Sequence, residues 1–145
     1  MTATGIPGQN DGLIDTNILF HAQTHDAHSE ECRRFLTALE RGNVQAVLDP
    51  VVLHELTYVL PRYVKQMSRQ DVATYLEVVL SWPGIQGDKA TMIDAVQRWG
   101  STPGLAFADA YLAARAASEA RPVYTKNVRE LRGQIVGVPE PLPSG

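Results

Sequence analysis

The sequence contains a single cysteine, Cys32, among its 145 residues. A disulfide within the chain is therefore excluded, and a reducing compartment is expected. No apolar stretch approaches the roughly 20 residues that a membrane-spanning helix requires. Residues 1–9 lack the basic and then apolar pattern of a secretory signal peptide. Together these absences predict a cytoplasmic protein with no membrane segment.

The chain also lacks an excess of positive charge. Its formal net charge is −3, so it has no general attraction to nucleic acid, and any RNA binding must come from a local basic patch. Hydrophobic residues make up 44% of the chain and charged residues 20%. This composition supports a buried core and is not typical of a disordered chain.

The length fits one domain. We expect a flexible N-terminal arm at residues 1–12, a single domain at 13–138, and an irregular tail at 139–145 that contains three prolines. Apolar periodicity and turn residues predict an alternation of strands and helices. The expected strands are 13–14, 46–48, 85, 123–125 and 135–136, and the expected helices are 27–41, 51–64, 68–80, 90–99 and 105–119. This alternation predicts an α/β fold, a three-layer α/β/α sandwich around a mostly parallel sheet of about five strands.

Three carboxylates occur in apolar surroundings. Asp15 directly follows the expected strand at 13–14, which places it at a strand end where sites form in parallel sheets. Glu55 and Asp109 each have apolar residues three and four positions away, so each is expected on or beside the buried face of its helix. Buried carboxylates repel one another unless they are protonated, hydrogen-bonded or share a cation.

Each acid also has a purely structural explanation. Asp15 can cap a helix, Glu55 can extend from the edge of a buried face to solvent, and Asp109 can favour the start of its helix through the helix dipole. All three being structural at once is the less economical hypothesis. Oxygen ligands without nearby cysteine or histidine favour Mg²⁺ or Mn²⁺ over zinc.

Four segments stand out along the chain: LIDTNIL at residues 13–19, HELTYVL at 54–60, FADAYLAA at 107–114 and YTKNVREL at 124–131. The first three contain these acids. Taken together and in this order, the four segments resemble the sequence motifs of PIN-domain nucleases. The chain length is also similar to that of the VapC-type toxins of bacterial toxin–antitoxin pairs. The resemblance implies a metal-dependent endoribonuclease that uses Mg²⁺ or Mn²⁺, is usually a homodimer, and is silenced by a small antitoxin protein.

The resemblance also implies roles for individual residues. Asp15, Glu55 and Asp109 would be metal ligands, and Asn127 would complete the catalytic set where the family often has an aspartate. An amide oxygen can bind a metal or orient a water molecule, but it adds no charge, so a one-metal site is expected. Two further sets of candidates follow. The side chains that would hold the carboxylates in place are Thr16, Asn17 and Thr125. The cationic side chains that could contact RNA are Lys126, Arg129 and Arg115.

Other functions remain open at this point. The same fold could bind RNA without cutting it, could serve as a stand-alone RNA-processing nuclease, or could use the same acids as a phosphatase or DNA nuclease. The pair His54-Glu55 begins a zinc-protease signature, but Tyr58 stands where the second histidine is required. His21, His25 and His28 share helical spacing, and we interpret them as a polar surface because no cysteine or further histidine accompanies them.

Overall fold

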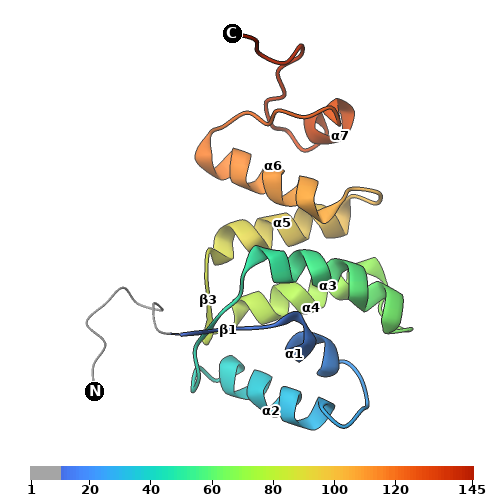
Figure 1. The fold of residues 1–145 in the computed structure, drawn as a ribbon, viewed down its shortest axis with the longest axis vertical. Coiled ribbons are helices and arrows are strands. Elements are labelled where there is room, and N and C mark those ends of the chain that lie inside the picture. The colour runs from blue at the N-terminus through green and yellow to red at the C-terminus, as the bar shows by residue number, and fades with distance from the viewer. Residues whose placement is uncertain (1–10) are drawn as a thin grey trace, which may run out of the picture. The chain divides into compact units, whose positions relative to one another are not determined.

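The computed structural model describes residues 11–145, which fall into two compact units, unit 1 ending at Lys89 and unit 2 at Ala90–Gly145 (Figure 1). Most of the predicted N-terminal arm, residues 1–10, lies outside the described residues. The arm was also predicted to include Gly12, which instead begins the first strand. The single domain expected at residues 13–138 stays a prediction, and each unit is described by itself.

Unit 1 contains a parallel sheet in the order β1-β2-β3. The strands are β1 (Gly12–Leu13), β2 (Ala46–Val47) and β3 (Ile85–Gln86). Pairing continues one residue beyond each of the first two strands. Ile14 N donates to Val47 O at 3.0 Å, and Leu48 N donates to Gln86 O at 3.0 Å. Because the strands are parallel, the residues that follow β1 and β2 leave the sheet at the same edge.

Four helices of unit 1 pack around this sheet: α1 (Thr16–His21), α2 (Ser29–Glu40), α3 (Pro50–Tyr63) and α4 (Arg69–Ser81). The start of α3 is set by Asp49, whose side chain accepts a hydrogen bond from Val51 N, and by Pro50 in the first turn. Ser68 and Asp71 form a capping box at the start of α4. Helix α1 packs against α2 and α3, and α3 packs against α4 (Figure 1). Their contacts bury leucines completely, among them Leu19, Leu53, Leu56, Leu60, Leu76 and Leu80.

Gly84 marks the close approach of β3 to the end of α2. A Cβ atom there would lie 2.5 Å from Leu39 O and 2.8 Å from Leu39 Cα, and closer still to Val44 O. Gly84 N also donates to Leu39 O, and Gly84 O accepts from Ala46 N. The backbone can therefore pass here only without a side chain.

Unit 2 contains α5 (Lys89–Ser101), which begins at the last residue of unit 1, with α6 (Phe107–Glu119) and α7 (Val128–Arg132). A small apolar cluster joins α6 and α7 to the segments that flank α7. Its buried members are Ala113, Ala116, Val123, Leu131 and Val138. Across residues 11–145, no helix is both long enough and apolar enough to cross a membrane.

The prediction of about five strands is wrong for the described residues, which contain three. The expected strands at 123–125 and 135–136 are irregular. They approach each other through a hydrogen bond from Val123 N to Gly137 O at 2.8 Å. Two local features oppose a longer ladder: Pro122 has no N–H to donate, and Ile135 adopts a left-handed φ of 62°.

Candidate active site

Asp15 occupies the N-cap position of α1, directly after the edge of the sheet. Its backbone is extended there, with φ −83° and ψ 150°, yet its side chain makes no capping hydrogen bond. The residue is exposed, whereas its neighbour Thr16 is buried. The structural explanation for Asp15, that its carboxylate caps the helix, is therefore not supported, and that carboxylate remains available for a ligand.

Glu55 lies in the second turn of α3, beside the stripe formed by Leu53, Leu56 and Leu60. Its side chain is exposed, while Val52 and Val59, three positions before and four positions after it, are half-buried. Of the two expected positions, on or beside the buried face, Glu55 occupies the second, and Asp15 is likewise exposed at the margin of the core. Solvent weakens the repulsion between acids in such positions.

A cavity of about 320 Å³ lies where α1 packs against α3. Its lining residues are Thr16, Asn17, Phe20, Glu55, Val59 and Tyr63. Thr16 and Asn17, which were expected to hold the carboxylates, therefore line the same cavity as Glu55. Asp15 is not part of this lining, although it adjoins Thr16 in the chain.

Unit 2 brings together the other two site candidates. Asp109 is half-buried in the first turn of α6, and Asn127 is the N-cap residue of α7. Asn127 Nδ2 donates a hydrogen bond to Asp109 Oδ2 at 3.3 Å. Thr125 Oγ1 accepts a hydrogen bond from Asn127 N at 2.9 Å. In this structure Thr125 therefore holds the backbone of Asn127 in place, rather than holding a carboxylate as expected.

The three cationic candidates differ in their surroundings. Arg115 donates to both carboxylate oxygens of Glu119, at 2.7 and 3.2 Å, and Arg121 lies 2.8 Å from the same group. The hydrogen bond from Arg115 is the main reason that the pKa of Glu119 lies below its usual value. Lys126 and Arg129 are exposed beside the fourth motif. Arg115 is thus already engaged by a carboxylate of its own helix.

The chemistry of the candidate ligands fits a hard divalent cation, because carboxylate and amide oxygens are the groups that Mg²⁺ and Mn²⁺ prefer. Asp15 and Glu55 belong to unit 1, and Asp109 and Asn127 belong to unit 2. Among residues 11–145, the structure holds no group of three or more His, Cys, Asp or Glu side chains that could bind a metal ion.

The pattern of one protein family matches residues 12–131, a segment that includes all four candidate residues and both local arrangements described above. That family is the PIN domain. The chain belongs to the PIN domain family. Comparisons with curated proteins and with solved structures gave no match.

Membership of the PIN family establishes an α/β fold of the nuclease type. PIN domains are generally metal-dependent nucleases that act on RNA or DNA. The family resemblance noted in the four sequence motifs is thereby confirmed. The match confirms neither the VapC-type subclass nor a preference for RNA.

Sequence reasoning did not assign three residues of the α1–α3 cavity to the site, Phe20, Val59 and Tyr63. A signal for Tyr63 was present, because Glu55, Val59 and Tyr63 are spaced at i, i+4 and i+8 and so follow one face of a helix. Phe20 similarly lies four positions after Thr16 on α1.

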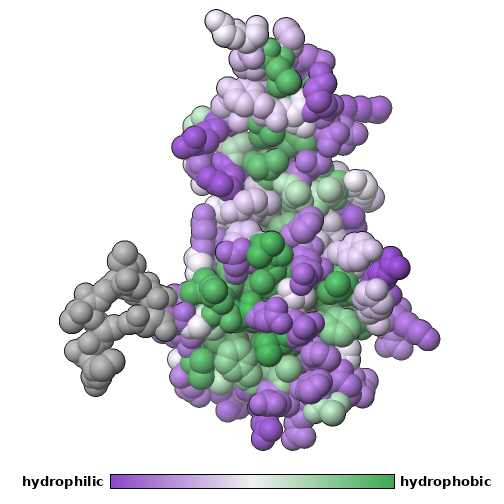
Figure 2. Space-filling model, in the orientation of Figure 1, coloured by the Kyte–Doolittle hydropathy of each residue, from purple (hydrophilic) through white to green (hydrophobic). Residues whose placement is uncertain are grey.

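A second cavity of unit 1, about 510 Å³, lies between α1 and α2. Its lining is largely apolar and includes Leu13, Ile18 and Phe35. Figure 2 shows hydrophobic side chains gathered on the viewer's face of unit 1, where β1 lies. The lining also includes His21 and His28, whose rings contact each other with centroids 5.0 Å apart. His21 Nδ1 lies 2.7 Å from Asp26 Oδ2, so this histidine stabilises the α1–α2 turn.

Proposed function

We propose that this PIN domain is a Mg²⁺- or Mn²⁺-dependent endoribonuclease that hydrolyses RNA phosphodiester bonds. The observation that carries the proposal is that its three motif acids do little for the fold. Asp15 makes no capping bond, and Glu55 has no ion-pair or hydrogen-bond partner among residues 11–145. In the described part of the chain, the only hydrogen-bond partner of the Asp109 side chain is the amide of Asn127, at a long 3.3 Å. Acids kept at helix starts and cavity margins without structural partners are typical of a ligand site.

In the proposed site, Asp15, Glu55 and Asp109 would hold the cation, and Asn127 would orient a water molecule or the scissile phosphate. A divalent ion held by these groups would lower the pKa of the attacking water and stabilise the charge that develops on the phosphate oxygens. Thr16 and Asn17, which line the same cavity as Glu55, would hold the carboxylates in position. Lys126 and Arg129, which are exposed beside Asn127, would contact the RNA backbone.

A panel of substrates tests this function. Purified full-length protein is incubated with structured RNA, single-stranded RNA, single-stranded DNA and a small phosphoester, in Mg²⁺, Mn²⁺ or EDTA. Cleavage of RNA alone that requires the metal is expected. Binding of RNA without cleavage under every condition would instead identify a non-cleaving module, and hydrolysis of DNA or the phosphoester would assign a different substrate class.

We further propose that the protein is the toxin of a type II toxin–antitoxin pair that acts in the cytoplasm as a homodimer. The match of the PIN domain to residues 12–131 is compatible with this role. The large apolar cavity between α1 and α2 is compatible with a small protein partner. The test is co-expression with the product of any short neighbouring reading frame, with growth, RNA cleavage and molar mass as readouts. Absence of such a neighbour, with growth unaffected by the PIN protein alone, would favour a stand-alone RNA-processing nuclease.

A further inference from the structure

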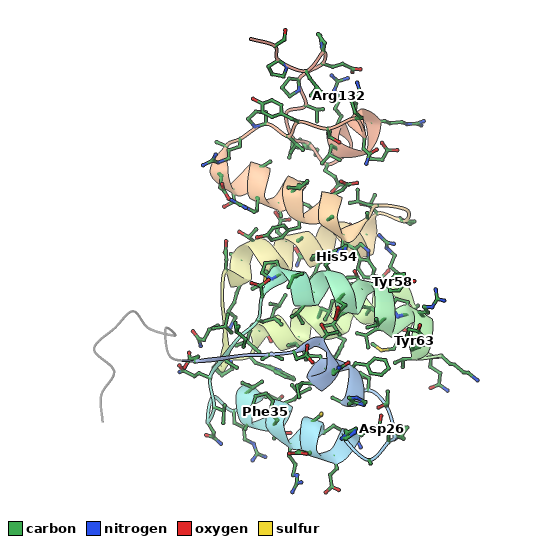
Figure 3. The ribbon with its side chains drawn as sticks, in the orientation of Figure 1. Asp26, Phe35, His54, Tyr58, Tyr63 and Arg132 are labelled. Carbon is green, nitrogen blue, oxygen red and sulfur yellow. The ribbon has the colours of Figure 1, made fainter. Side chains whose placement is uncertain are left out.

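Two tyrosines on α3 are largely exposed. Tyr58 retains 62% and Tyr63 retains 60% of its accessible surface, although aromatic residues form only 7% of the chain. Figure 3 shows both along α3, with Tyr63 near its C-terminal end. An exposed tyrosine by itself needs no explanation, but these two are joined by a third residue.

Arg62 lies between the two rings. Its Nη1 donates to Tyr58 Oη at 3.1 Å, and its guanidinium carbon lies 5.6 Å from the centroid of each tyrosine ring. Both distances are within the range of cation–π attraction. Arg62 has no carboxylate partner among residues 11–145, so its charge is not neutralised there. Tyr58, Arg62 and Tyr63 are referred to below as the tyrosine–arginine cluster.

The tyrosine–arginine cluster continues into the candidate site. Tyr63 lines the same cavity of about 320 Å³ as Glu55 and Asn17. Tyr63 and Glu55 are eight residues apart on α3, which is about two helical turns or 12 Å along its axis. Successive nucleotides of an extended strand can span such a distance, so one strand could contact both residues.

We propose that the tyrosine–arginine cluster binds an unpaired nucleotide of single-stranded RNA next to the cleavage site. A base stacks on the exposed ring of Tyr63, and Arg62 attracts the adjoining phosphate. Every base has a π face, whereas the bases of a duplex are already stacked on one another, so this surface selects single-stranded regions without reading their sequence. The inference rests on the proposed function, because it adds substrate-binding residues to that same site.

The experiment measures the binding of a fluorescent single-stranded RNA, and of the same strand in a duplex, to the full chain in EDTA. EDTA prevents metal-dependent cleavage, so binding is read separately from catalysis. Tyr63→Leu should weaken binding of the single strand by about fivefold or more, because it removes the stacking ring. Tyr63→Phe keeps the ring and should bind within about twofold of the wild type. Duplex binding should be weak and unchanged in both variants.

Two further variants make the result specific. Val51→Ala removes a side chain that is 66% exposed on the same helix but lies outside the cavity, and it should leave binding unchanged. Arg62→Gln should make binding less dependent on salt. The slope of log affinity against log salt concentration should decrease by about the amount expected for one lost phosphate contact. Melting temperatures of all variants should stay close to the wild-type value, because the altered side chains are exposed.

Several results would overturn the inference. The inference would be wrong if the wild type bound single strand and duplex with equal affinity. It would also be wrong if Tyr63→Leu bound the single strand as tightly as the wild type, or if Val51→Ala weakened binding as much as Tyr63→Leu. A change in molar mass in Tyr63→Leu would assign the tyrosine–arginine cluster to contact with a second copy of the chain instead. Failure of the proposed function appears differently, as intact selective binding of single-stranded RNA by a protein that cleaves nothing in Mg²⁺ or Mn²⁺.

Discussion

Replacing Glu55 with glutamine separates function from folding more cleanly than any other substitution in the candidate site. The change preserves shape and removes one negative charge from an exposed side chain that has no partner in residues 11–145. The free energy of unfolding should therefore change by less than about 0.5 kcal/mol, which corresponds to roughly 3 °C or less in melting temperature. If Glu55 is a metal ligand, RNA cleavage should fall about 100-fold or more, or about 2.7 kcal/mol in transition-state stabilisation.

The assay compares initial rates of RNA cleavage in Mg²⁺ and Mn²⁺ with calorimetric titration of each metal, for the wild type and Glu55→Gln. Glu40→Gln is the matched control, since Glu40 is an exposed glutamate on α2, outside both cavities of unit 1 described above. It should retain full activity and metal affinity. Activity of Glu55→Gln within about threefold of the wild type would refute the assignment. A fall in melting temperature of many degrees would show instead that Glu55 supports the fold.

Three other substitutions probe separate parts of the chain. Asn127→Asp would place a second carboxylate against Asp109 and remove the Nδ2 donor, so the melting temperature should fall by a few degrees in EDTA and recover in Mn²⁺; a rise in EDTA would contradict this. Gly84→Ala should destabilise unit 1 by about 2 kcal/mol or more in urea unfolding, because its Cβ would collide with the backbone of Leu39. The backbone N–H of His28, and then Thr24 and His21, hold the pKa of Asp26 below its ordinary value of 3.8. A carboxyl group whose pKa is lowered in the fold stabilises the protein at pH values above its unfolded pKa, and this stabilisation is lost as the pH falls through its folded pKa. The melting temperatures of the wild type and Asp26→Asn should therefore converge in acid.

Helices α3 and α4 could be predicted because their start signals are local. Asp49 followed by Pro50, and Ser68 followed by Asp71, act within one turn of the backbone that they cap. The expected helices at 51–64 and 68–80 are confirmed to within one residue at each end. The first three strands were also found near their expected positions, since each is a short apolar run bounded by turn residues.

The remaining strands could not be predicted because pairing depends on partners distant in sequence. Residues 123–125 have the composition of a strand, yet the left-handed backbone at Ile135 prevents a regular partner. The spacing of apolar residues could not predict that Glu55 is exposed, because it identifies a helical face but not where the margin of that face meets solvent. The order of the motifs predicted that Asp109 and Asn127 belong to one site. The hydrogen bond between them could be seen only in the folded structure, because the two residues are 18 positions apart in the chain.

The amide of Asn127 has a consequence for how a cation could enter. It presents its nitrogen to Asp109 Oδ2, so a hydrogen bond satisfies one oxygen of that carboxylate. A cation beside Asp109 would repel this N–H group, because only the amide oxygen can act as a ligand. Asn127 could therefore join Asp109 in holding a cation only if its side chain turned over and exchanged this hydrogen bond for coordination by its oxygen.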